Sequence, residues 1–293
     1  MTHSESASSS TPGETSAPYG SGPASSSAPA GRVRLHHLQA AKAEGRHFAM
    51  LTAYEQYTAE IFDEAGIEVL LIGDSASNNV FGNETSLPVT VDELLPLTRA
   101  VARAAKRALV LADLPFGSYE ASIEQAVTTG VRFLKEGLAH AVKMEGGAYY
   151  ADTVRAMVQA GIPVMGHIGF TPQSEHALGG YRVQGRGDDA ARLVEDALAL
   201  QEAGAFAVLM EMVPADTAAQ VDAALTIPTV GIGAGNVTTG QVLVWQDAMG
   251  LRGGRMARFV KQYAQLRQTL LEGARNYGEE VRDGSFPGPE HSF

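Results

Sequence analysis

Charged and polar side chains follow several short apolar runs of the chain, at the point where each run ends. They are Tyr54, Asp74 with Ser75, Asp113, Lys143 with Glu145, His167 and Glu211. A single Asp in such a place is commonly a turn residue or a helix N-cap. The same placement after five different runs is harder to explain by capping. It predicts that these side chains share one site suited to acid–base chemistry.

Three of these residues raise a problem of charge. Asp74, Asp113 and Glu145 would place three carboxylates around one opening, and ionised carboxylates in a partly buried site repel one another. A hard divalent cation such as Mg²⁺, held by carboxylates, substrate oxygens and water, would compensate. Zinc is disfavoured because the chain has no Cys and no His-x-His pair. The alternative is a salt-bridge network neutralised by Lys143 alone, and spacing does not decide between the two.

Glu211 and His167 are the candidates for proton transfer and substrate binding. Glu211 ends an apolar run that begins at Ala207, so desolvation should raise the pKa of its carboxyl towards the range of a general base. The alternative is an acid that pairs with the dipole of the following helix. His167 is either a neutral donor to a substrate oxygen or a satisfied core residue.

Two glycine-rich segments complete the candidate site. Residues 179–187 carry two arginines and suit a mobile lid over an anionic substrate, although an exposed basic loop would look the same. Residues 231–236 end the seventh run and suit either a phosphate cradle or a close approach of backbone.

These side chains need a scaffold that brings the ends of many strands together. The strands expected are Phe48–Thr52, Val69–Gly73, Ala108–Ala112, Ala141–Met144, Val164–His167, Ala207–Glu211 and Thr229–Ile232, with an eighth near Gln241–Trp245 that could instead be a helix. Amphipathic helical stretches between them include Ser122–Glu136, Tyr149–Ala160, Asp188–Ala203 and Asp216–Ala224. Continuous apolar strands alternating with helices predict an α/β fold, specifically a (β/α)₈ TIM barrel. A doubly wound sheet is the competing fold.

The two ends of the chain differ from this pattern. Residues 1–31 are rich in Ser, Ala, Pro and Gly, which predicts a disordered tail, whereas residues 32–293 should form a single barrel domain. Leu35, Leu38 and Ala41 indicate a short N-terminal helix before the first strand. An extra C-terminal helix is expected over Phe259–Tyr277, packed on the barrel or on a neighbouring subunit.

Composition narrows the class of protein. The chain has 293 residues and a formal net charge of −11, which argues against nucleic-acid binding because phosphate contacts need clustered Lys and Arg. It has no cysteine, so thiol catalysis and disulfides are excluded and a cytoplasmic location is expected. It has no apolar run of the length that a membrane span needs.

The strand-end motifs resemble those of the ketopantoate hydroxymethyltransferase family. The motifs are Leu51–Tyr54, Gly73–Ser75, Leu87–Thr90, Ala112–Phe116, Val142–Gly147, Gly166–Ser174, Gly179–Gly187, Gly231–Asn236 and Glu290–Phe293. The resemblance runs from about residue 34 to residue 293, and the order of the motifs makes it specific.

The resemblance implies a reaction, a cofactor and an assembly. A hydroxymethyl group would pass from 5,10-methylenetetrahydrofolate to 3-methyl-2-oxobutanoate, via a Mg²⁺-stabilised enolate, giving 2-dehydropantoate in the first step of pantothenate biosynthesis. The family commonly forms a decamer of two pentamers. By motif, Asp74 and Asp113 would hold Mg²⁺ with Glu145 in or near its shell, and Glu211 would be the base. Ser75 and Lys143, with Asp74 and Asp113, would bind the 2-oxo acid, and Tyr54 and His167 would line the pocket.

Two other functions remain open at this point. One is a metal-dependent lyase or mutase of the phosphoenolpyruvate/pyruvate barrel type, which would act on a 2-oxo acid derivative without folate. The other is a catalytically silent barrel that binds a small acid, against which the complete set of acidic strand-end residues argues.

Overall fold

The computed structural model describes residues 31–293, so the tail predicted for residues 1–31 lies almost wholly outside the described residues. Gly31–Phe293 form one compact unit. No helix of this described part has the length and apolarity needed to cross a membrane.

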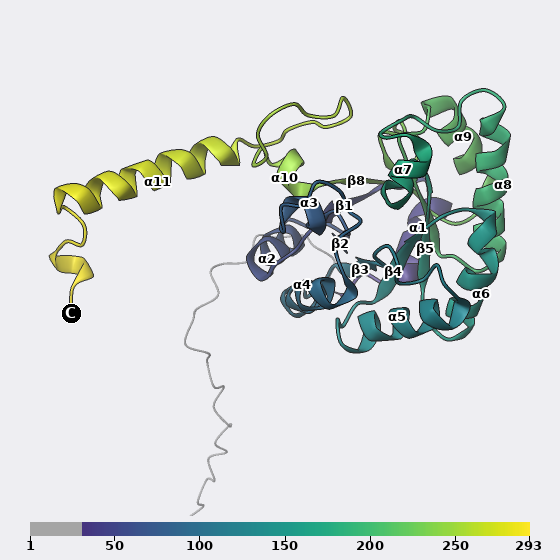
Figure 1. Ribbon diagram of the computed structural model, residues 1–293, viewed down its shortest axis with the longest axis horizontal. Helices are drawn as coiled ribbons and strands as arrows, with labels where there is room; N and C mark the ends of the chain where they lie inside the picture. Colours follow the sequence, from purple (N-terminus) through teal and green to yellow (C-terminus); the bar gives the residue numbers. More distant parts are fainter. Residues whose placement is uncertain (1–30) are drawn as a thin grey trace, which may run out of the picture. The chain divides into compact units, whose positions relative to one another are not determined.

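Eight parallel strands close into a barrel, in the order in which they occur along the chain (Figure 1). They are β1 (Phe48–Thr52), β2 (Val69–Ile72), β3 (Leu109–Asp113), β4 (Ala141–Glu145), β5 (Val164–Gly169), β6 (Ala207–Glu211), β7 (Thr229–Ile232) and β8 (Gly240–Leu243). Strand β8 pairs with β1 and closes the ring. The predicted (β/α)₈ barrel is therefore confirmed, and the doubly wound sheet is excluded.

Helices alternate with the strands along most of the chain, and α11 (Leu266–Asp283) projects away from the barrel (Figure 1). The helices are α1 (Leu35–Ala43), α2 (Gln56–Glu64), α3 (Ala76–Asn79), α4 (Val91–Ala104), α5 (Ile123–Lys135), α6 (Ala151–Gln159), α7 (Glu175–Leu178), α8 (Asp189–Glu202), α9 (Ala215–Ala224), α10 (Trp245–Ala248) and α11, with short 3₁₀ turns at Ala148–Tyr150, Pro172–Ser174 and Pro289–His291. The local sequence determines where some of these helices begin. The Thr90 hydroxyl accepts from the backbone N–H of Glu93, whose carboxylate accepts from the N–H of Thr90, a capping box that begins α4.

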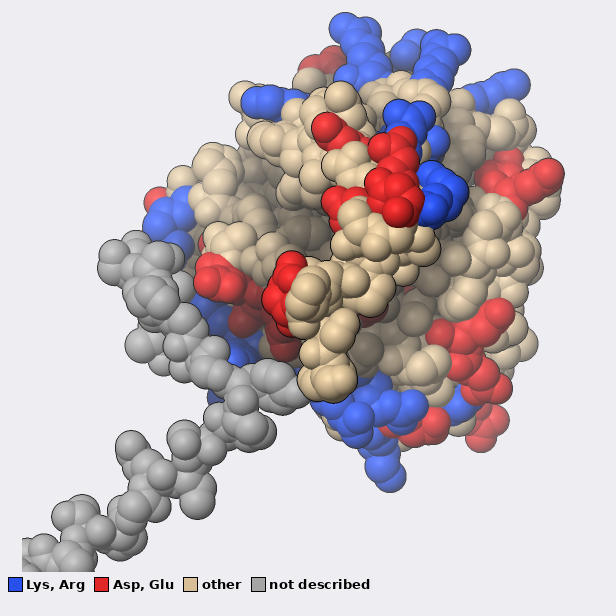
Figure 2. All heavy atoms as spheres, turned by 90° about the vertical axis from the view of Figure 1, so that its left-hand side faces the viewer, with Lys and Arg blue, Asp and Glu red and all other residues tan. Residues whose placement is uncertain are grey.

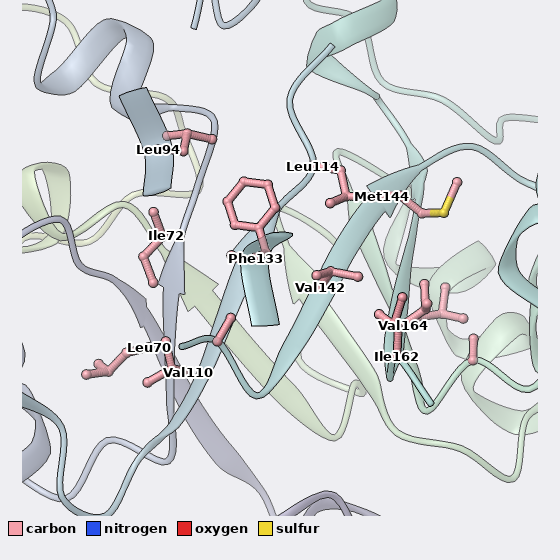
Figure 3. Close-up of a cluster of buried hydrophobic side chains, with 14 of the residues drawn as sticks. Leu70, Ile72, Leu94, Val110, Leu114, Phe133, Val142, Met144, Ile162 and Val164 are labelled. Atoms are coloured by element: carbon pink, nitrogen blue, oxygen red, sulfur yellow. The ribbon is translucent and has the colours of Figure 1, made fainter. Parts of the chain in front are cut away.

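Alternation along the strands divides the apolar residues between two cores. Leu70 and Ile72 of β2 face outwards and pack with residues from the helices, including Leu94 of α4 and Phe133 of α5 (Figure 3). Val69 and Leu71 of the same strand face into the barrel. Because side chains of a strand alternate between its faces, each strand supplies both cores.

The barrel interior is apolar at the end where the strands begin. Its residues include Met50, Leu109, Leu111, Met165 and Leu209, and Leu38 and Ala41 of α1 join the same cluster. The predicted N-terminal helix is thus present, and it seals the barrel at the end opposite the candidate site. Polar side chains are consequently confined to the other end of the interior, where the strands finish.

Two predicted elements have different boundaries in the structure. The segment near Gln241–Trp245 divides, with the strand ending at Leu243 and α10 beginning at Trp245. The predicted helix over Phe259–Tyr277 is wrong at both ends, since α11 runs from Leu266 to Asp283 and the chain before it is irregular. The reason is tertiary, because Phe259 packs against Gly233 at the end of β7, 2.8 Å from where a Cβ would stand. No side chain of α11 is buried.

The packing of the outer core predicts a large effect of removing Phe133, which is 0% exposed. We expect Phe133→Ala to lower the free energy of unfolding by about 3–5 kcal/mol, because the cavity cannot collapse between α5 and the barrel. Urea unfolding followed by circular dichroism measures the change. The matched control is Phe116→Ala, at a side chain that is 50% exposed, for which we expect about 0.5 kcal/mol or less. Equal losses in the two variants would contradict this view of the core.

Candidate active site

Strand register brings the predicted residues to one end of the barrel. Asp113 of β3 pairs with Lys143 of β4, and Glu145 of β4 pairs with His167 of β5. Glu211 of β6 lies beside Gly169 of β5. The alternation that places Leu109, Leu111 and Leu209 in the barrel interior also points the residues two positions further along, Asp113 and Glu211, inwards.

One lysine is surrounded by several acids. The Nζ of Lys143 lies 2.9 Å from Oδ1 of Asp113, and both side chains are about as buried as the hydrophobic core. The backbone N–H of Asp74 donates to Oδ2 of Asp113 at 2.9 Å. Burial lowers the pKa of Lys143, but the carboxylates of Asp113, Glu145 and Asp74 raise it more, and the net direction is upward. Lys143 is therefore a permanent cation.

Burial makes the ionised forms of the acids less favourable. Burial, with the charge of Asp113 next in importance, raises the pKa of Asp74 to about 6. Burial also raises the pKa of Asp113 and holds the pKa of Glu145 well above its usual range. Lys143 opposes these shifts without cancelling them. One lysine is therefore insufficient to keep all the acids ionised, which weakens the hypothesis that Lys143 alone neutralises them.

His167 is buried between Lys143 and two acids. Burial, followed by the charge of Lys143, holds the pKa of His167 well below its usual range. Nδ1 lies 3.3 Å from Nζ of Lys143 and 3.5 Å from Oε1 of Glu145. The buried Nε2 has no hydrogen-bond partner among residues 31–293, and it lies 3.5 Å from Oε2 of Glu211. It can donate to an oxygen that enters the site.

Glu211 has the environment of a general base. Burial, partly offset by Lys143, raises the pKa of Glu211 to about 8. The backbone there is unusual, because Met212 has a positive φ of 48°, a conformation that is costly for a side chain of this kind. Gly169 has a φ of 89°, and a Cβ at this position would collide with the carbonyl oxygen of Glu211. Close backbone packing and a strained residue together set the direction of the Glu211 side chain.

Two residues with no predicted role tie the acids together. The backbone N–H of Gln173 donates to Oε2 of Glu145 at 2.9 Å, and its Nε2 donates to Oδ2 of Asp74 at 2.9 Å. The hydroxyl of Tyr119 donates to Oε1 of Gln173 at 2.6 Å and accepts from the N–H of Glu145 at 3.3 Å. Gln173 lies four residues beyond the end of β5, in the 3₁₀ turn Pro172–Ser174, so a rule based on strand ends does not single it out.

A cavity of about 1490 Å³ opens over these residues. It is lined by Asp74, Ser75, Asp113, Lys143, Glu145, His167 and Glu211, so the structure brings these predicted residues together. Tyr54 differs, because it is buried behind the wall and its hydroxyl lies 2.8 Å from Oγ of Ser75. It therefore contacts Ser75 rather than the cavity.

The acid cluster has the donor chemistry of a site for a hard cation. Oε1 of Glu145 is buried without a hydrogen-bond partner among residues 31–293, and the carboxylates of Asp74 and Asp113 line the same cavity. Within residues 31–293 no three His, Asp or Glu side chains converge as a complete ligand set. Carboxylate oxygens are the ligands that Mg²⁺ prefers, and the ion commonly keeps water or substrate oxygens in the rest of its shell.

Solved structures of other proteins share the fold at low sequence identity. A phosphonopyruvate hydrolase in complex with oxalate and Mg²⁺ superposes with a TM-score of 0.56 at 16% identity, over 88% of this chain and 92% of the other. A 2,3-dimethylmalate lyase superposes with a TM-score of 0.54 at 16% identity, over 87% and 92%. At this identity the likeness concerns the barrel architecture alone.

Sequence comparison finds relatives of much higher sequence identity. The 3-methyl-2-oxobutanoate hydroxymethyltransferase of Paenarthrobacter aurescens (strain TC1) is 78% identical over 97% of both chains, and that of Arthrobacter sp. (strain FB24) is 77% identical over the full length of both. The sequence profile of the ketopantoate hydroxymethyltransferase family matches residues 32–289. Because the match includes every strand of the barrel and all of the strand-end residues, this chain belongs to the ketopantoate hydroxymethyltransferase family, whose members are transferases.

Proposed function

We propose that this protein transfers a hydroxymethyl group from 5,10-methylenetetrahydrofolate to 3-methyl-2-oxobutanoate in the cytoplasm, giving 2-dehydropantoate. The observation that supports this most is the grouping of a buried lysine, a neutral histidine and an acid of raised pKa around one cavity. The name of the close relatives agrees with it.

Binding of the 2-oxo acid follows from the charges of the site. The Nζ of Lys143 is a compact positive charge that can hold the substrate carboxylate, and Nε2 of His167 can donate to a substrate oxygen. We propose Asp74 and Asp113, with Glu145, as the residues that would hold Mg²⁺. When bound, the ion would stabilise negative charge that develops on the keto oxygen. Ser75, held by Tyr54, would contact the substrate at the cavity wall.

Glu211 would then move the proton. Its carboxylate takes the proton from C3 of the 2-oxo acid, and the electron pair left at C3 forms the new bond to the methylene carbon of the folate. One of the two bonds from that carbon to nitrogen breaks as the ring of the folate opens, which leaves the carbon open to attack by C3. Water then displaces the second nitrogen and supplies the hydroxyl oxygen. The proton from C3 and one proton of the water end on the two nitrogens, and tetrahydrofolate leaves. A pKa near 8 suits Glu211 to accept a proton and to return it later.

The lyase or mutase alternative has weaker support. Only the fold likeness to a phosphonopyruvate hydrolase and a 2,3-dimethylmalate lyase favours it, and one barrel architecture serves many chemistries. A silent barrel is disfavoured because burying so many acids would destabilise the fold without serving a purpose.

The reaction itself is the first test. We expect the protein with 3-methyl-2-oxobutanoate, methylenetetrahydrofolate and Mg²⁺ to give 2-dehydropantoate, detected by mass spectrometry. Without folate, the C3 proton should exchange with deuterated water, and Glu211→Gln should slow this exchange by about 10²-fold or more because the base is removed. Glu290→Gln, at an exposed acid, is the matched control and should exchange normally. Folded protein that yields no product would refute the proposed reaction, and normal exchange in Glu211→Gln would refute the role of Glu211.

The raised pKa of Glu211 predicts a pH dependence. A general base must be ionised, and its ionised form increases as the pH rises through about 8. The rate of C3 exchange should therefore rise with pH by about tenfold per unit below that pKa and level off above it. NMR measurement of the exchange rate between about pH 6 and 10 tests this. A rate that is independent of pH, or that falls across this range, would contradict the assignment of the base.

We also propose that the chain forms a homo-oligomer, and specifically a decamer of two pentamers. The support is an exposed apolar face on α11. Leu270, Tyr277 and Val281 recur at helical spacing and are 58%, 60% and 47% exposed. Apolar stripes of this kind commonly bind another protein surface.

Substitution of this face tests the assembly. Leu270→Glu combined with Tyr277→Glu should reduce the mass found by analytical ultracentrifugation, because two charges would have to be buried in the interface. Gln268→Glu combined with Asn276→Glu adds the same charge to the opposite face of α11 and should leave the mass unchanged. Equal masses for both double variants would contradict an interface at this face.

A further inference from the structure

We propose that Arg186, Arg252, Arg255 and Arg258 form a binding site for the glutamate carboxylates of the reduced folate. We name these four residues the arginine rim. All four are exposed and line the wall of the same cavity as the acids. The inference rests on the proposed function, since it assigns an end of the cavity to the folate.

The size of the cavity leaves room for a second ligand. Its volume of about 1490 Å³ exceeds the roughly 300–1,000 Å³ of pockets that hold a drug-sized molecule, and a five-carbon acid is much smaller than that. The acid would occupy only the inner end, beside Lys143. The remaining space extends over the ends of β6, β7 and β8 towards residues 252–260.

Two segments from different parts of the chain form the outer end of the cavity. Residues 252–260 lie between α10 and α11, and Phe259 anchors them on Gly233 after β7. Arg186 belongs to the glycine-rich segment after β5, which is held over β6 by a hydrogen bond from the N–H of Gln184 to the carbonyl of Met212 at 3.0 Å. The arginines therefore converge through tertiary structure and not through a single sequence motif.

The charge of this wall differs from that of the protein as a whole. Arg252 forms an ion pair with Asp247 at 3.5 Å, and Asp216 lines the same side. Four arginines against these two acids leave a net charge of 4 − 2 = +2, in a chain of net charge −11. Figure 2 shows Lys and Arg side chains gathered along its upper edge, the level at which Figure 1 places the connection between α10 and α11. Such a wall attracts an anion.

The walls between the two ends are apolar and suit a flat ligand. The ring of Tyr181, 66% exposed, packs on Phe170 with centroids 4.7 Å apart and lines the cavity. Met212, Met256 and Phe259 contribute further apolar surface. A reduced folate has this same division, with a flat pterin and aminobenzoyl part followed by glutamate carboxylates. Its methylene carbon would face Glu211, and its carboxylates would reach the arginine rim.

The experiment compares ligands that differ only in their glutamates. The probes are tetrahydropteroate, which has no glutamate, tetrahydrofolate, and tetrahydrofolate triglutamate, and their dissociation constants are measured by calorimetry on the full chain. Wild-type protein should bind the triglutamate most tightly and lose that preference at high salt. Arg255→Ala combined with Arg258→Ala should weaken triglutamate binding by about 3- to 30-fold and leave tetrahydropteroate binding unchanged.

A control of equal charge separates a local effect from the net charge. Arg103→Ala combined with Lys106→Ala also removes two positive charges, from exposed side chains at the end of α4 and just beyond it, and should change neither affinity. The KM for the 2-oxo acid should be the same in all three proteins, because its carboxylate binds at Lys143.

The outcomes distinguish this proposal from the one on which it rests. A rim variant that keeps the wild-type preference for the triglutamate, or that loses affinity for all three probes equally, would overturn the arginine rim while wild-type turnover still supports the reaction. Wild-type protein that binds none of the probes and forms no product would overturn the proposed reaction, and the rim with it.

Discussion

The site depends on holding buried carboxyl groups around one lysine. Asp74, Asp113, Glu145 and Glu211 lose hydration at the mouth of the barrel, and burial raises the pKa of each one. Lys143 is the one buried cation among residues 31–293. Such an arrangement persists only when the surrounding structure over-determines it, because each acid would otherwise turn towards water.

The barrel meets this requirement through its strands and their loops. Alternation points Lys143 and Glu145 into the interior from β4, and register places Asp113 and His167 beside them. Gln173 and Tyr119 then restrain the carboxylates with hydrogen bonds that leave Oε1 of Glu145 free. At the opposite end, the apolar interior and α1 exclude water, so the polar layer has one entrance.

Charge is distributed unequally around that entrance. The acids stand on β2, β3 and β4, whereas the arginines stand over β6 to β8, and Glu211 lies between the two groups. In the proposed reaction, this division would give a small oxo acid and a larger anionic donor separate ends of one cavity. The new bond would form where the two ends meet, beside the proposed base.

The amino-acid sequence by itself determined the barrel, most strand positions and the acid, lysine and histidine residues at the strand ends. It did so because period-2 alternation, apolar runs and the strand-end rule are local properties of a parallel barrel. Only the tertiary structure decided the bridging of the acids by Gln173, the position of Tyr54 behind Ser75 and the late start of α11. Each of these depends on contacts between residues far apart in the chain, such as Phe259 on Gly233, and no local pattern of residue types records such a contact.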